Sequence, residues 1–146
     1  MILYRGSTIQ IDHPICDYGR PNLDFGQGFY VSDNEEFVLR WAKSSSGKNS
    51  IINYYELDLN GLNVLRFKRG KKWFDYIFKN RSGFTDEYGD ADVIIGPVAN
   101  DTLYDTYGLI TSGFLKKEDS LKLLMIGSAY TQIALKTEKA AKQLKF

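Results

Sequence analysis

The sequence contains few of the residues that most often cross-link a small fold or act in catalysis. Its 146 residues include one cysteine and one histidine. Cys16 alone cannot form an internal disulfide and suits a reducing cytoplasm, which is the location we expect. His13 alone excludes zinc sites built from several histidines, and we expect no bound metal. Any Ser-His or Cys-His nucleophile would have to use His13, which precedes Pro14 in a loop-like stretch and is expected to be a surface residue.

Strong charge and long apolar runs are also missing. The formal net charge is +1, so no overall field indicates DNA, RNA or an anionic membrane as a partner. No segment approaches the length of a membrane span, and the opening Met-Ile-Leu-Tyr-Arg lacks the apolar core of a signal peptide. A composition of 43% hydrophobic and 25% charged residues is globular. We therefore expect one domain over residues 1–146 that folds without a metal or disulfide.

The chain is organised around a glycine-containing stretch, Asp24-Phe25-Gly26-Gln27-Gly28-Phe29-Tyr30-Val31-Ser32. Gly26 and Gly28 directly precede a short aromatic and β-branched run, which predicts a strand. The glycines are explained either by a tight turn into this strand or by a ligand that approaches the backbone closely. Within the strand, Tyr30 and Val31 are expected on opposite faces.

The remaining pattern mixes strands and helices without strict alternation, which is typical of an α+β fold. After a cap in Ser32-Asp33-Asn34, Phe37, Val38 and Trp41 recur at helical spacing and are expected to point inward. The densest basic run, residues 68–72, is either solvated surface or a contact for a phosphate. Strands are expected over residues 1–4, 51–59, 62–67, 92–97 and 130–135, and helices over residues 34–43, 72–80, 100–110, 117–126 and 137–144.

Three separated pieces resemble the motifs of ADP-ribosyltransferases. Leu3-Tyr4-Arg5-Gly6-Ser7 resembles the first motif, a strand ending in His-Gly or Arg-Gly. Residues 26–32, with the helix through Trp41-Ala42, resemble the second motif of the poly(ADP-ribose) polymerase-like and diphtheria-toxin-like branch. Residues 130–135 are similar to the strand of the third motif, with Gln132 where glutamate is usual. The whole chain is also similar to a small bacterial family of this superfamily through residues 24–30, 93–101 and 132–140.

The resemblance implies a fold and an activity. The fold would be an α+β, ADP-ribosyltransferase-like split pair of small antiparallel-rich sheets with peripheral helices and NAD in the cleft between the sheets. The activity would be NAD-dependent mono-ADP-ribosyl transfer to an unknown macromolecule, without a metal. Some relatives resemble toxins of toxin–antitoxin pairs, so the resemblance implies that the chain acts as such a toxin. A small antitoxin protein is then an expected partner, and a membrane is not.

The resemblance also implies roles for individual residues. Arg5, Tyr30 and Gln132 would be the catalytic residues. Tyr30 would stack on the nicotinamide ring, and the Gly6 backbone would bind its carboxamide. Arg5, which stands where this branch usually has histidine, would bind the pyrophosphate through its forked guanidinium. The full NAD-binding set is Arg5, Gly6, Ser7 (at the adenine-side ribose), Gly28, Phe29, Tyr30 and Gln132.

Gln132 is the main departure from the family pattern. Cleavage of the glycosidic bond builds positive charge on the ribose, and a carboxylate about 4 Å away is worth roughly 4 kcal/mol at an effective dielectric constant of 20. Its loss would slow cleavage about a thousandfold. Glu138 could substitute for it, or could simply complement a helix N-terminus. Two alternatives to the transferase therefore stay open: an NAD glycohydrolase, and a catalytically inactive module that binds NAD or a protein.

Overall fold

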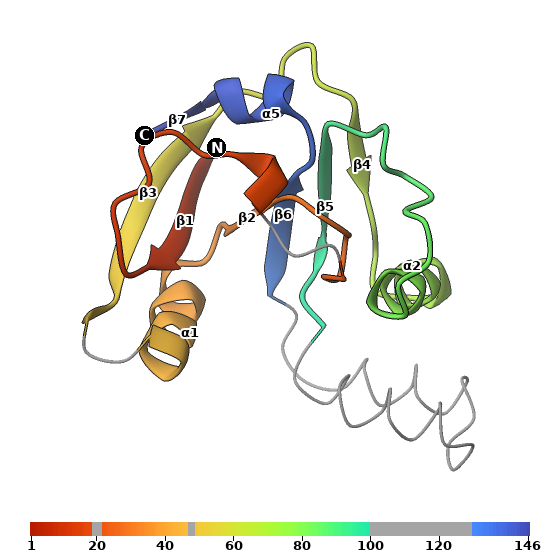
Figure 1. Cartoon of the computed structure of the whole chain (residues 1–146), viewed down its shortest axis with the longest axis horizontal. Coiled ribbons are helices and arrows are strands. Elements are labelled where there is room, and N and C mark those ends of the chain that lie inside the picture. Colours follow the sequence, from red (N-terminus) through yellow and green to blue (C-terminus); the bar gives the residue numbers. More distant parts are fainter. Residues whose placement is uncertain (19–21, 47–48, 100–129) are drawn as a thin grey trace.

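The computed structural model describes residues 1–18, 22–46, 49–99 and 130–146 (Figure 1). Within these ranges, seven strands form one mixed sheet in the order β4-β5-β6-β2-β1-β3-β7. The β4–β5 pair is parallel and every other pair is antiparallel, so the expected α+β class is confirmed. The helices expected over residues 100–110 and 117–126 lie outside the described residues. The strands are β1 (Ile2–Ser7), β2 (Phe29–Ser32), β3 (Ile51–Leu57), β4 (Val64–Arg66), β5 (Val93–Pro97), β6 (Thr131–Leu135) and β7 (Leu144–Lys145).

The pairing between β1 and β2 is much shorter than that of their other neighbours. These two strands are paired through the single register position Tyr4↔Ser32, whereas β1 and β3 share six positions and β2 and β6 share four. Figure 1 shows β1 and β2 diverging on either side of this junction. The expectation of two separate small sheets is thus revised in one respect, because the two halves are joined by hydrogen bonding at one residue pair.

Helix α1 (Glu35–Ser46) packs against β1. The Asn34 side chain caps it by accepting a hydrogen bond of 2.9 Å from the Phe37 amide, within the predicted capping segment. Val38 and Ala42 are buried as their spacing requires. The prediction that Trp41 points inward is wrong: the residue is 59% exposed, because Val38 and Ala42 already occupy the narrow stripe that contacts the sheet.

Helix α2 (Lys71–Arg81) lies beside β4 and β5 and confirms the predicted apolar stripe. Trp73, Phe74 and Ile77 are buried, and Phe78 is partly buried. The chain end differs from prediction, because the helix expected over residues 137–144 is only α5 (Glu138–Lys142). It stops early since Leu144 pairs with Leu57 and adds β7 to the sheet edge.

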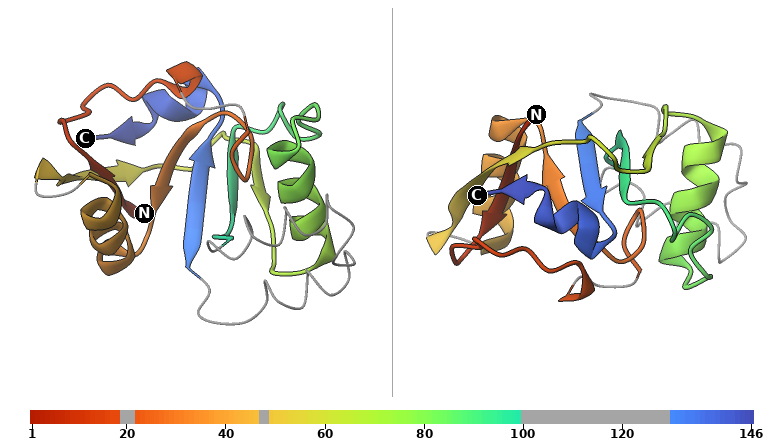
Figure 2. Two further views of the ribbon diagram at one scale, coloured as in Figure 1. Left: turned by 60° about the horizontal axis from the view of Figure 1, so that its bottom comes forward. Right: turned by 90° about the horizontal axis from the view of Figure 1, so that it is seen from above.

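The two faces of the sheet carry separate hydrophobic cores. Figure 2 shows α5 and α1 on opposite sides of the strands. The first core lies under α5, β7 and the segment containing the 3-10 turn η1 (Cys16–Tyr18), and the second lies under α2. Leu3, Phe29, Val31, Tyr55, Ile95, Ile133 and Leu135 belong to the first core, and Phe25, Trp73, Phe74, Tyr76, Ile77, Ile94 and Ala134 to the second.

Candidate functional site

The predicted NAD-binding residues divide between the two faces of the sheet. Residues directly opposite each other in an antiparallel pair share a face, so the positions Tyr4↔Ser32 and Ser32↔Gln132 place three side chains together. Strand alternation then assigns the other predicted residues. Arg5, Ser7 and Phe29 lie on the first-core face, and Gly6, Tyr30 and Gln132 lie on the second-core face.

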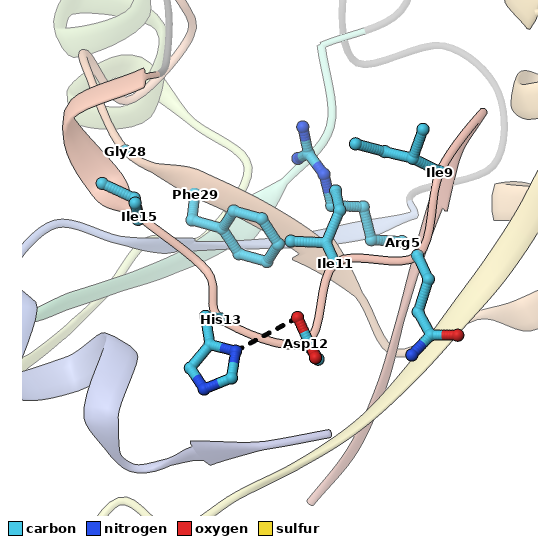
Figure 3. Close-up of a pocket in the computed structure, with 9 residues that line it drawn as sticks. Arg5, Ile9, Ile11, Asp12, His13, Ile15, Gly28 and Phe29 are labelled. Carbon is cyan, nitrogen blue, oxygen red and sulfur yellow. Dashed lines mark ion pairs between the residues drawn. The ribbon is translucent and has the colours of Figure 1, made fainter.

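A pocket of about 320 Å³ lies on the first-core face around Arg5. Phe29 and Gly28 also line it, so three of the seven predicted residues meet there. The Ser7 hydroxyl accepts a hydrogen bond from the Ile9 amide at 3.2 Å and helps the chain to turn into the opposite wall. Figure 3 shows Arg5 and Phe29 beside this wall. The wall consists of Ile9, Gln10, Ile11, Asp12, His13 and Ile15.

The Arg5 guanidinium is held inside this pocket. Its Nη1 donates a hydrogen bond of 2.8 Å to the Tyr30 carbonyl oxygen, and its Cζ lies 4.5 Å from the centre of the Phe29 ring. Its Nε is buried without a hydrogen-bond partner, and no acidic side chain of the described residues forms an ion pair with it. Burial lowers the pKa of Arg5 from its ordinary value because the charged form loses hydration. The pocket is therefore lined by a cation that has no acidic partner among the described residues.

Two side chains from β3 hold the pocket wall in place. Asn53 Oδ1 accepts a hydrogen bond of 2.9 Å from the Ile11 amide, and the Tyr55 hydroxyl donates one of 2.6 Å to the Ile11 carbonyl oxygen. Burial raises the pKa of Tyr55 to about 12, so the phenol remains a donor at neutral pH. Neither residue was singled out from the sequence, although a buried asparagine on an otherwise apolar face of a strand is a usable signal.

Asp12 and His13 form a pair at the pocket rim, with 3.1 Å between His13 Nδ1 and Asp12 Oδ1 (Figure 3). This contact lowers the pKa of Asp12. The His13 side chain is 91% exposed, so the prediction of a surface histidine is confirmed. Its position beside the Arg5 pocket was not predicted.

The glycines are explained by packing and turn geometry within the protein. Gly26 has φ +76°, in the left-handed region that favours glycine. A Cβ at Gly28 would lie 2.8 Å from the Leu135 carbonyl oxygen, and one at Gly6 would lie 2.6 Å from Ala42 Cβ. Of the two interpretations offered by the sequence, the tight turn accounts for the Gly26–Gly28 pair, and Gly6 allows α1 to approach β1.

The Tyr30 hydroxyl forms two hydrogen bonds within residues 24–28, which we call the glycine loop. It accepts a hydrogen bond of 2.9 Å from the Phe25 amide and donates one of 2.5 Å to the Gly26 carbonyl oxygen. Its ring packs against the second core. Burial raises the pKa of Tyr30, so the phenol stays protonated and can donate. Tyr30 therefore stabilises the glycine loop whatever its role toward a ligand.

Gln132 is similarly engaged within the protein. It is only 9% exposed, and its Nε2 donates to Asp24 Oδ2 at 2.9 Å and to the Pro97 carbonyl oxygen at 3.2 Å. Asp24 also accepts a hydrogen bond of 2.6 Å from Arg81 Nε, and the two residues form a buried ion pair. We call Asp24, Arg81 and Gln132 the Asp24 network. Its amide–carboxylate contact is one that a glutamate at position 132 could not make in its ionised form.

A second, partly buried ion pair lies on the other side of residues 24–28. Lys136 Nζ lies 2.6 Å from Asp86 Oδ2 and also donates to the Phe25 carbonyl oxygen. The Tyr76 hydroxyl donates to Asp86 Oδ1 at 2.5 Å. Glu138, the other carboxylate considered from the sequence, is exposed in the first turn of α5, consistent with complementing that helix end.

Within the described part of the chain, no three His, Cys, Asp or Glu side chains are grouped to hold a metal ion. None of the helices described is both long and apolar enough to cross a membrane. A comparison with proteins of curated function finds no match. The chain matches, over residues 1–146, the family described as "Protein of unknown function (DUF3990)", and it belongs to that family.

Proposed function

We propose that the chain is an NAD-dependent, mono-ADP-ribosyltransferase-like protein whose Arg5 pocket binds the pyrophosphate of NAD. The observation that supports this proposal most is the Arg5 guanidinium, buried beside Phe29 with an unsatisfied Nε and no acidic partner among the described residues. A planar guanidinium binds phosphate oxygens through paired hydrogen bonds, and burial strengthens these bonds. An anionic ligand would supply the counter-charge that the described acidic residues do not.

The size of the pocket limits which part of NAD it holds. A volume of about 320 Å³ is at the lower end for small-molecule sites and is too small for a whole dinucleotide. The pyrophosphate and an adjoining ribose fit the chemistry of the lining, which combines one cation with apolar side chains and the Asp12–His13 pair. The remaining parts of NAD would lie outside this pocket.

The transfer reaction would break the bond between ribose C1 and the nicotinamide nitrogen, and the bonding electrons would leave with nicotinamide. C1 would then bond to an acceptor atom, which loses a proton. Gln132 carries no charge to stabilise the developing cation, and its amide nitrogen is already bonded to Asp24 and Pro97. We therefore expect slow transfer.

The uncharged Gln132, whose amide is already bonded to Asp24 and Pro97, favours a second candidate, a module that binds NAD without cleaving it. The NAD glycohydrolase, the toxin role and the antitoxin partner rest on the resemblance and stay predictions. Incubation with NAD labelled in its ADP-ribose part and with cell lysate separates these activities. Label on a macromolecule supports transfer, nicotinamide release without transferred label supports hydrolysis, and binding with neither supports the module.

Binding itself is tested by calorimetry with NAD, ADP-ribose and nicotinamide. We expect NAD and ADP-ribose to bind and Arg5→Gln to weaken both by about 10- to 100-fold, as the loss of a charged hydrogen-bond donor should. Arg40→Gln is the matched control, because Arg40 is exposed and contacts Tyr130 instead of the pocket. No binding at millimolar NAD, or unchanged binding by Arg5→Gln, would contradict the proposal.

A further inference from the structure

The positive charge of this nearly neutral chain is concentrated in one segment. Between Asp58 and Asp86 the sequence contains seven Lys and Arg residues and one acidic residue, Asp75. Because the whole chain has a net charge of only +1, the remainder is net acidic. A polyanion would therefore be attracted to this segment and repelled by the rest of the surface.

Four of these basic side chains make no ion pair with any described residue. Lys79 pairs with Glu87 and Arg81 pairs with Asp24, whereas the exposed Arg66, Lys68, Lys71 and Lys72 have no such acidic partner within the ranges that the structure describes. We call these four residues the basic edge.

The fold places the basic edge along one side of the molecule. β4, which ends at Arg66, is the outermost strand of its half of the sheet, and α2 begins at Lys71 beside it (Figures 1 and 2). The first turn of α2 contains no acidic residue, and its cap, Gly70, provides no side-chain hydrogen bond. The positive end of the helix dipole therefore adds to the potential of the lysines.

A hollow of about 290 Å³ opens between this edge and the ends of β5 and β6. Trp73 Nε1 donates a hydrogen bond of 2.9 Å to the Pro97 carbonyl oxygen, which fixes the first turn of α2 to a residue of its wall. This hydrogen bond links one wall of the hollow directly to α2. Its lining consists of Arg66, Phe67, Lys68, Ile95, Gly96, Pro97, Tyr130 and Thr131.

We propose that the basic edge and this hollow bind a single-stranded nucleic acid. Unpaired Lys and Arg side chains would contact successive phosphates, and the hollow, with its apolar and backbone walls, would receive a base or sugar between them. A nucleic acid carries one negative charge on every nucleotide, so it matches the basic edge, four residues within seven positions, better than an acidic protein with scattered carboxylates. In the proposed NAD reaction, the bound nucleic acid would be the acceptor of ADP-ribose, and this part of the proposal rests on the proposed function. Binding of the nucleic acid does not depend on that reaction.

The test is fluorescence anisotropy of a short labelled single-stranded RNA, and of its DNA counterpart, with the full chain and without NAD. Four phosphate contacts predict a slope of log affinity against log salt of about −2.8, since each contributes about 0.7 on a single strand. The double variant Arg66→Gln/Lys68→Gln should reduce the slope by about 1.4 and the affinity at least about tenfold. The matched control is Lys142→Gln/Lys145→Gln, which removes two exposed lysines from α5 and β7 and should change little.

Three results would overturn this proposal: no binding at about 50 mM salt, an equal loss in both double variants, or competition by polyglutamate as effective as by unlabelled RNA. The last result would assign the edge to an acidic protein partner. Circular dichroism of each variant checks that it is folded. Because NAD is absent from the assay, failure of the NAD proposal would leave the binding result unchanged, and the reverse also holds.

Discussion

Arg5 and Gln132 are both polar residues in neighbouring halves of the sheet, but their surroundings differ. The Arg5 guanidinium faces a pocket and keeps a buried Nε without a partner. The Gln132 amide faces the protein interior and donates to Asp24 and Pro97. Two residues singled out by one resemblance thus have different surroundings: Arg5 lines a pocket, whereas Gln132 is hydrogen-bonded to the residue that begins the glycine loop.

The largest effect should come from breaking the Asp24 network at its centre. Asp24→Ala leaves the buried guanidinium of Arg81 without its counter-ion, so the free energy of unfolding should fall by about 3–5 kcal/mol. Urea denaturation measures this change, with the exposed Asp33→Ala as the control. A loss as small as the control's would show that the network does not hold the loop.

Gln132→Glu should also destabilise the protein, by about 2–4 kcal/mol at neutral pH, because a carboxylate would replace the amide donor beside Asp24. Repulsion would raise the pKa of the new glutamate above its unfolded value of about 4.3, so the loss should grow as pH rises from about 4 to 7. Urea denaturation across this range tests the sign, and the exposed Gln10→Glu is the control. Faster nicotinamide release by Gln132→Glu would instead place position 132 at the ribose, as the resemblance implies.

Gly28→Ala tests whether the glycine loop needs glycine at this position for packing. The added Cβ would lie 2.8 Å from the Leu135 carbonyl oxygen, and this overpacking should cost about 1–3 kcal/mol. Gly89→Ala is the control, since its Cβ would meet no atom closer than 3.5 Å. If thermal unfolding shows the two variants to be equally stable, Gly28 is not required for packing, and close approach of a ligand becomes the better explanation.

The smallest effect on stability is expected at Arg5. Arg5→Gln removes one hydrogen bond to Tyr30 but also removes the cost of burying a charge, so unfolding should change by less than about 1 kcal/mol. The same variant should lose most of its NAD affinity, whereas Asp24→Ala should lose stability first. A large destabilisation by Arg5→Gln would mean that Arg5 is structural as well, and the contrast with Gln132 would disappear.

Local sequence patterns predicted much of the fold correctly. The Asn34 cap, the buried Val38 and the apolar stripe of α2 follow from hydrogen bonding and helical spacing within a few residues. The single cysteine excluded an internal disulfide from composition alone. The exposure of Trp41 and the early end of α5 were not predictable in this way, because each depends on which surface the packed sheet offers to the helix.

Spacing and residue type were enough to predict the α+β class, the strand that follows Gly28 and the presence of Arg5 and Gln132 on two different strands. The contacts of those residues depend on how the sheet is assembled. Asp24 and Gln132 are 108 positions apart, and Asn53 reaches Ile11 from 42 positions away. Strand order and register create such contacts, and a shift of one residue in register would move each side chain to the opposite face. The division of the predicted site between a pocket and a buried network is therefore a property of the assembled sheet.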